Sequence, residues 1–435
     1  MSQISAVAAS ERRNAALELA NQGRVTEAER AFEALLDDAS EDAEALNFLA
    51  ICAYRRGQIE SALALLDRAR KAQPDDPTTL VNIGTLQRER GSLDEAHAAL
   101  KRGTDLAPDL YGARLRLGET LQALGRRDEA VAVYFGAITA AQEQGLWLDE
   151  ATTAVDLRPL VLHAIRIVSS ARHTLFTQLL QPLRERHGAA ALARVEKSLA
   201  IYLGDLPPNY PDPAQQPLFL YFPDLPNPRV FPRELFPWYA ELEAHSAAIR
   251  SEMLGVLAED RGFEPFLGHF DDANQVQSLL GGKGAQPAWN AFFFYRHGVA
   301  NDANMARCPR TTAALQAAPL CHVRQHAPEV CFSVLTPGSH ILPHRGVTNT
   351  RVVTHLALVV PNDCALVVSG HVQTWEEGRC FSFDDTFEHE AYNRSADTRV
   401  VMLLDAWNPY LTEIERSAVG ELIGGIGDFN RKAGV

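Results

Sequence analysis

A repeat of 34 residues in the first third of the chain constrains its fold more than any other feature. Four glycines keep this spacing, and each is followed five residues later by an alanine and nine residues later by a large apolar residue. The three sets are Gly23, Gly57, Gly91 and Gly125; Ala28, Ala62, Ala96 and Ala130; and Phe32, Leu66, Leu100 and Tyr134. Glycine at the turn between two helices, and alanine where the helices approach closely, predict stacked helix pairs that bury their apolar faces against one another.

The period and the residue types resemble the tetratricopeptide repeat. Pro74 and Pro108 keep the same spacing at the junctions between repeats, whereas the first junction has Ser40. The resemblance implies a solenoid whose groove binds a peptide or protein. Self-association through the repeats is an equally good interpretation.

Length and composition predict a soluble protein of two or three domains, because 435 residues exceed what one core fills. The net charge of −14 argues against a nucleic-acid partner, which would require a basic surface. No apolar run is long enough for a transmembrane segment, and the first residues lack the apolar stretch of a secretory signal. The six scattered cysteines, without a CxxC pair, predict free thiols and a cytoplasmic protein.

Four regions are expected along the chain. Residues 1–145 hold the tetratricopeptide repeats, 146–206 form a helical extension or cap, and 207–240 form a connector rich in proline and aromatic residues. Residues 241–435 are the last domain, which opens with a helix from roughly Tyr239 to Val256 and then becomes β-rich. Short apolar runs separated by turn residues predict a sandwich or jelly roll there. These runs are 292–295, 330–335, 351–360, 365–368, 380–383 and 399–404.

Two histidines in this last domain stand in distinctive settings. His344 follows the segment Pro337-Gly338-Ser339-His340-Ile341-Leu342-Pro343. His389 follows the segment Phe383-Asp384-Asp385-Thr386-Phe387-Glu388. Arg399 opens the apolar run that comes ten residues after His389. Two imidazoles and one arginine on separate strands suit an iron site that holds an organic diacid beside the metal. The alternatives are buried structural histidines, and an ion pair of Arg399 with Asp384, Asp385 or Asp405.

These motifs closely resemble the aspartyl/asparaginyl β-hydroxylase family of 2-oxoglutarate-dependent oxygenases, from about residue 215 and most specifically from Phe332 onward. The resemblance implies a double-stranded β-helix (jelly-roll) oxygenase domain after the all-α solenoid. It also implies Fe(II), with 2-oxoglutarate and O2 as cosubstrates. His344 and His389 match the metal ligands and Arg399 the clamp for the distal carboxylate. Ser333 matches a position that also hydrogen-bonds the cosubstrate, and His355 matches the residue near its keto-acid end.

Position 346 agrees with the pattern of this family, and position 353 departs from it. Gly346 stands where most such oxygenases have a ligating carboxylate, but hydroxylases of this family lack that carboxylate. Val353 replaces an arginine of animal members, so Arg351, on the same strand face, is expected to contact either the cosubstrate or the carboxylate of the substrate. Trp375-Glu376-Glu377-Gly378 is interpreted as a turn. Lys283 and Arg296 are interpreted as surface charges, with contact to an acidic substrate as the alternative.

The resulting hypothesis is a dioxygenase that hydroxylates the β-carbon of Asp or Asn in a peptide or protein, with the repeats recruiting the substrate or a partner. The alternatives are a hydroxylase of a free amino acid or a lipid acyl chain, an Fe(II) halogenase that uses the vacancy at Gly346, and a non-catalytic repeat adaptor.

Overall fold

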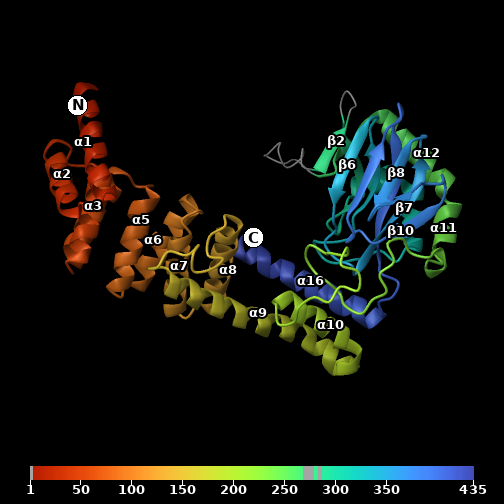
Figure 1. Ribbon diagram of the computed structural model, residues 1–435, viewed down its shortest axis with the longest axis horizontal. Helices are drawn as coiled ribbons and strands as arrows, with labels where there is room; N and C mark the ends of the chain where they lie inside the picture. Colours follow the sequence, from red (N-terminus) through yellow and green to blue (C-terminus); the bar gives the residue numbers. More distant parts are fainter. Residues whose placement is uncertain (1–2, 268–278, 283–286) are drawn as a thin grey trace. The chain divides into compact units, whose positions relative to one another are not determined.

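The N-terminal repeats are helix pairs in the computed structural model, which describes residues 3–267, 279–282 and 287–435 (Figure 1). The pairs are α1 (Gln3–Asn21) with α2 (Val25–Asp38), α3 (Ala43–Arg55) with α4 (Ile59–Ala72), α5 (Pro77–Glu89) with α6 (Leu93–Leu106), and α7 (Tyr111–Ala123) with α8 (Arg127–Glu143). Asp42 and Asp76 cap α3 and α5 by accepting hydrogen bonds from the backbone N–H groups of Ala45 and Thr79.

The packing of the repeats follows the periodic residues. All four glycines between paired helices have φ between +74° and +84°, which an L side chain rarely adopts. The four alanines and the four large residues that follow them are completely buried. A side chain at Gly118 would overlap the ring of Tyr134, so this glycine lets α7 and α8 approach closely. The predicted tetratricopeptide solenoid is confirmed.

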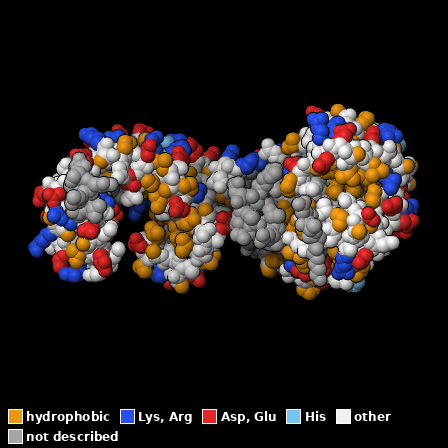
Figure 2. All heavy atoms as spheres, turned by 90° about the horizontal axis from the view of Figure 1, so that it is seen from above, with side chains coloured by type: hydrophobic (Ala, Val, Ile, Leu, Met, Phe, Trp, Pro, Cys, Tyr) orange, Lys and Arg blue, Asp and Glu red, His pale blue; other side chains and the backbone are white. Residues whose placement is uncertain are grey.

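The chain divides into two compact units, residues 1–172 with 429–435, and residues 173–428. The long helix α9 (Arg158–His187) and α10 (Ala189–Leu203) follow the repeats, and α16 (Glu413–Ala433) comes last. None of the helices in the described ranges is both long and apolar enough to cross a bilayer. On the face drawn in Figure 2, Lys and Arg side chains are interspersed with Asp and Glu over the repeats.

Two antiparallel sheets form the core of the second unit. The larger has the strand order β1-β3-β5-β12-β7-β10, with β4 beside β3, and the smaller has the order β2-β6-β11-β8-β9. The larger sheet comprises β1 (Glu264–Pro265), β3 (Trp289–Arg296), β4 (Val299–Ala300), β5 (Val330–Leu335), β7 (Arg351–Val359), β10 (Cys380–Phe383) and β12 (Arg399–Trp407). The smaller comprises β2 (Leu280–Gly282), β6 (Ser339–His344), β8 (Cys364–Val368), β9 (His371–Gln373) and β11 (His389–Asn393).

The larger sheet is buried on both faces. Its inner face packs against the smaller sheet through residues such as Phe293, Val401 and Leu366. Its outer face is covered by α11 (Tyr239–Ala244), α12 (Ser246–Glu259) and α15 (Pro309–Ala314), with η1 (Arg233–Leu235), α14 (Asp302–Arg307) and η2 (Leu315–Ala317) nearby (Figure 1). This two-sheet architecture agrees with the predicted jelly-roll class.

One detail differs from the expectation. The helix predicted from Tyr239 to Val256 is two helices, because the backbone departs from helical geometry at His245 (φ −93°, ψ 0°). The proline-rich connector is irregular except for η1 and the start of α11, and its buried residues Leu220 and Phe222 lie against the segment before β7. The precise domain boundaries stay predictions.

Candidate active site

His344 and His389 face each other at the same end of the smaller sheet. His344 ends β6, His389 begins β11, and the two residues are direct partners in the antiparallel register. Their ring centroids lie 4.1 Å apart. The sheet therefore brings together two residues that are 45 positions apart in the chain.

Both rings are held in the same tautomer. Nδ1 of His344 donates to the carbonyl of Leu342 at 2.8 Å, and Nδ1 of His389 donates to that of Phe387 at 3.0 Å. A carbonyl can only accept, so the proton of each neutral ring is on Nδ1, and the lone pair on Nε2 is free to bind a metal. Burial, followed by the nearby His344, lowers the pKa of His389 to about 3. His389 is therefore neutral at physiological pH, as a metal ligand must be.

Asp385 fills the space beside Gly346. A side chain at position 346 would overlap its carboxylate, and the N–H of Gly346 donates to the backbone carbonyl of Asp385 at 2.6 Å. Oδ1 of Asp385 is buried and has no hydrogen-bond partner among the described residues. Burial raises the pKa of Asp385, while Arg351 and His344 act in the opposite direction. Asp385 was considered from the sequence only as an ion-pair partner of Arg399, and its place beside Gly346 depends on the tertiary structure.

Arg399 lies buried near the other end of the site, with only 2% of its surface exposed. Among the described residues it forms no ion pair with a carboxylate, and its Nε has no hydrogen-bond partner. One guanidinium nitrogen lies 3.5 Å from both Oγ and the backbone carbonyl of Ser333. Burial lowers the pKa of Arg399 to about 10, so it remains a cation at neutral pH. A buried, unpaired guanidinium is unfavourable unless an anion joins it.

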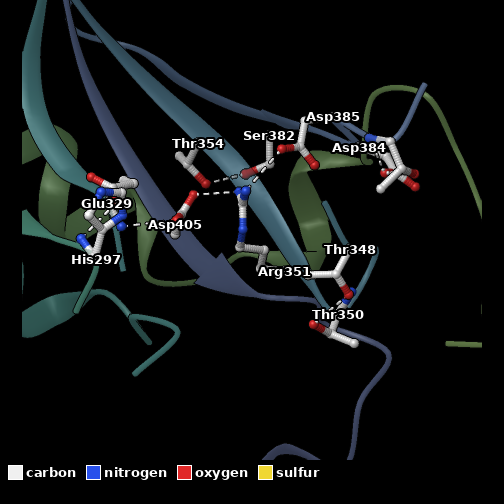
Figure 3. Close-up of polar contacts among 11 residues, drawn as sticks. His297, Glu329, Thr348, Thr350, Arg351, Thr354, Ser382, Asp384, Asp385 and Asp405 are labelled. Atoms are coloured by element: carbon white, nitrogen blue, oxygen red, sulfur yellow. Dashed lines mark hydrogen bonds and ion pairs between the residues drawn. The ribbon is translucent and has the colours of Figure 1, made fainter. Parts of the chain in front are cut away.

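Arg351 has a different environment, because two carboxylates already engage it. It contacts Asp405 at 2.7 Å and Asp385 at 3.2 Å, as Figure 3 shows. The ion pair considered for Arg399 is thus made by Arg351, two residues before Val353 on β7. Burial acts to lower the pKa of Arg351, but Asp385 and Asp405 together with other nearby groups raise it above its ordinary value. Burial raises the pKa of Asp405 to about 6.

One cavity of about 220 Å³ joins all of these groups. Its lining includes every residue that the sequence placed in the site, namely Ser333, His344, Arg351, His355, His389 and Arg399. Its walls are otherwise largely apolar and include Phe266, Ile341, Leu366 and Phe383. His355 is buried and its pKa is lowered, first by burial and then by Arg399, so that its ring is neutral.

The donor set fits a metal held by two protein ligands. In the described ranges, no group of three or more His, Cys, Asp or Glu side chains is arranged to hold a metal ion. In this part of the structure, two imidazoles that donate through Nδ1 to backbone carbonyls line the same cavity as Asp385, whose Oδ1 has no hydrogen-bond partner among the described residues. Arg296 pairs with Glu264 at 2.9 Å, and Lys283 lies outside the described residues.

Comparison with known proteins gives matches in both parts of the chain. Residues 243–409 match the family described as aspartyl/asparaginyl beta-hydroxylase, and residues 13–77 and 81–144 match the tetratricopeptide repeat. Aspartate beta-hydroxylase domain-containing protein 2 of Rattus norvegicus is 32% identical over 246 residues, which span 55% of this chain and 68% of the relative.

Two further relatives differ in their described activities. The ornithine lipid ester-linked acyl 2-hydroxylase of Rhizobium tropici is 35% identical over 195 residues, covering 44% of this chain and 65% of the relative. Aspartyl/asparaginyl beta-hydroxylase of Homo sapiens is 32% identical over 180 residues, covering 41% of this chain and 22% of the relative.

Proposed function

The chain belongs to the aspartyl/asparaginyl β-hydroxylase family, a family of hydroxylases, and we propose that it is a dioxygenase dependent on Fe(II), 2-oxoglutarate and O2. One observation carries the proposal. Two histidines whose Nδ1 atoms donate to backbone carbonyls share a cavity with a buried guanidinium that has no carboxylate partner among the described residues. This arrangement suits a metal at one end and an acidic cosubstrate at the other.

His344 and His389 would hold Fe(II) through Nε2. The bound iron and keto acid would supply activation of O2 for hydroxylation of an unactivated carbon. The protein orients the two imidazoles through the carbonyls of Leu342 and Phe387, and burial keeps His389 neutral. The largely apolar walls of the cavity limit the access of water.

Arg399 would bind the distal carboxylate of 2-oxoglutarate, with Ser333 and His355 as hydrogen-bond donors. The planar guanidinium supplies paired donors, and its burial strengthens the interaction with an anion. Both amino groups of Arg351 are engaged by Asp385 and Asp405, which favours Arg399 as the clamp. A contact of Arg351 with the cosubstrate stays a prediction.

The position of Asp385 argues against the halogenase alternative. That reaction would place a halide in the vacancy beside Gly346, but this carboxylate borders the same space. Two anions in a buried cavity repel each other, so chloride is disfavoured. The adaptor alternative is disfavoured by the complete set of His344, His389 and Arg399 within one cavity.

The proposed substrate is a peptide or protein, hydroxylated at the β-carbon of Asp or Asn. The tetratricopeptide repeats suggest peptide or protein binding and would recruit the substrate or a partner. A lipid acyl chain is the second candidate. It is favoured by the apolar walls of the cavity and by the similarity to the Rhizobium tropici acyl 2-hydroxylase.

Mass spectrometry of candidate substrates tests the proposal. Peptides containing Asp or Asn, and acyl lipids, are incubated with the protein, Fe(II), 2-oxoglutarate and ascorbate. We expect a product heavier by one oxygen atom that requires both Fe(II) and 2-oxoglutarate. Product formation that persists without 2-oxoglutarate would contradict the proposed chemistry.

A further inference from the structure

Two tryptophans donate hydrogen bonds to polar side chains of the cavity. The indole N–H of Trp289 on β3 donates to Oγ of Ser333 at 3.0 Å. The indole N–H of Trp375, in the turn before β10, donates to Nδ1 of His355 at 3.2 Å. Both tryptophans are at least nine-tenths buried. An indole N–H can only donate, so each tryptophan determines where its partner carries hydrogen.

The hydroxyl of Ser333 lies between two donors. Trp289 points its N–H at Oγ, and a guanidinium nitrogen of Arg399 lies 3.5 Å away. Neither of these groups can accept the hydroxyl hydrogen. No acceptor for this hydrogen is found among the described residues, and Ser333 lines the cavity. The hydroxyl is therefore available to donate to an acceptor inside the cavity.

The same reasoning fixes the tautomer of His355. Its Nδ1 accepts from Trp375, so the single proton of the neutral ring must lie on Nε2. In the described part of the chain, Nε2 makes no hydrogen bond, and the ring lines the cavity. The Trp375 and His355 rings lie edge to edge, with centroids 6.0 Å apart and planes 27° apart.

Trp375 also contacts the guanidinium of Arg399, the third donor in this part of the cavity. Cζ of Arg399 lies 5.2 Å from the centroid of its ring, within the range of a cation–π contact. One indole thus contacts the guanidinium through its face and His355 through its edge. Three donors remain without a carboxylate partner in the described residues: the Arg399 guanidinium, the Ser333 hydroxyl and the Nε2–H of His355.

We propose that Trp289 and Trp375 are positioning residues that make this end of the cavity a donor-only site for a carboxylate. Each indole N–H donates a hydrogen bond to the acceptor atom of Ser333 or His355. These two side chains can then act toward the ligand as hydrogen-bond donors. The identity of the ligand as 2-oxoglutarate rests on the proposed function; the orientation of the donors does not. Because the site would be preset before the anion binds, little reorganisation is needed on binding.

The tautomer of His355 tests the orientation directly. In the full-length protein labelled with 15N-histidine, without metal or cosubstrate, NMR shifts of the ring nitrogens show which one carries the proton; His355→Gln assigns the signals. We expect protonated Nε2 in the wild type and a mixture of tautomers in Trp375→Phe, which keeps a ring but lacks the N–H. Protonated Nδ1 in the wild type, or an unchanged tautomer in Trp375→Phe, would overturn the proposal for this residue.

Binding of 2-oxoglutarate supplies the second readout, by calorimetry with Mn(II) under anaerobic conditions. We expect Trp289→Phe and Trp375→Phe each to raise Kd by about tenfold, the effect of one poorly aligned hydrogen bond to a charged ligand. Trp238→Phe is the matched control, because this half-buried indole makes no hydrogen bond among the described residues and lies outside the cavity. A wild-type Kd in both site variants, or the same loss in Trp238→Phe, would overturn the proposal.

The two readouts separate the possible failures. If the wild type binds no 2-oxoglutarate while His355 is protonated on Nε2 and responds to Trp375→Phe, the proposed cosubstrate is wrong and the donor orientation stands. If 2-oxoglutarate binds but the tautomer does not respond, the cosubstrate stands and the positioning role of Trp375 is refuted. Thermal melting of each variant identifies any loss of folded protein.

Discussion

Replacing Arg399 by lysine is expected to weaken binding of 2-oxoglutarate by one to two orders of magnitude. The substitution keeps the positive charge but loses the planar pair of donors. A hydrogen bond to a charged group contributes about 1.5–3 kcal/mol, and tenfold in affinity corresponds to about 1.4 kcal/mol. Losing one well-formed bond therefore accounts for the lower limit. The burial of Arg399 supports a large effect, because water does not easily replace the missing donor.

Arg399→Met gives an independent prediction for the protein without ligand. The guanidinium is buried with no carboxylate partner among the described residues, so removing it should leave the melting temperature unchanged or raise it. The rise in melting temperature that 2-oxoglutarate causes in the wild type should disappear. A strongly destabilised Arg399→Met protein would show that Arg399 is already satisfied without an anion.

Calorimetry with Mn(II), without oxygen, measures the affinity of these variants. Arg296→Lys is the matched control, because this arginine pairs with Glu264 on β1 and does not line the cavity. An unchanged Kd in Arg399→Lys would refute the assignment of the clamp, and Arg351 would be the next residue to test.

Three further predictions address the metal, the repeats and pH. His344→Ala and His389→Ala should each abolish Fe(II)-dependent turnover while the melting temperature of the metal-free protein barely changes; activity in both variants would refute the ligand assignment. Gly118→Val should destabilise the repeats by about 1–3 kcal/mol, because its side chain overlaps Tyr134, and leave the Kd for 2-oxoglutarate unchanged in calorimetry. Burial raises the pKa of Asp384 to about 6, so its contribution to stability, on the order of 2 kcal/mol, is complete below about pH 4 and lost as pH rises through 6. Thermal melts from pH 4 to 7 should show a smaller decline in Asp384→Asn than in the wild type; parallel curves would contradict this.

The repeats were predictable from sequence because each needs the same local geometry. A glycine with positive φ, a fully buried alanine and a large apolar residue recur at one spacing, and the structure uses all of them in that way. Strands β5 and β10 were predicted with their observed bounds, since both are apolar runs interrupted by a single serine.

The two strands that carry the histidines were not predicted. In β11, the buried residues His389, Ala391 and Asn393 alternate with half-buried Glu390 and Tyr392, and only one of the buried three is apolar. β6 contains Pro343 and is similarly polar. Polar residues at inward positions indicate a functional site rather than a core. A search for apolar runs therefore does not find the strands that carry the site.

Contacts between residues distant in sequence could not be predicted from the sequence pattern either. Resemblance identified Arg351 and Arg399, but no local signal tells that Arg351 is paired with Asp385 and Asp405 while Arg399 has no carboxylate partner among the described residues. The tertiary structure decides this difference, because β7 lies between β12 and β10. Trp375 was interpreted only as part of a turn, since its contacts to His355 and Arg399 join separate strands.

The fate of oxygen tests the central claim most directly. The protein is incubated with Fe(II), 2-oxoglutarate, ascorbate and 18O-labelled O2, and the succinate formed is analysed by mass spectrometry. We predict succinate that carries one labelled oxygen atom, with formation that depends on Fe(II) and is lost in His344→Ala and His389→Ala. Unlabelled succinate, or labelled succinate formed equally by these variants, would contradict a 2-oxoglutarate-dependent dioxygenase at this site.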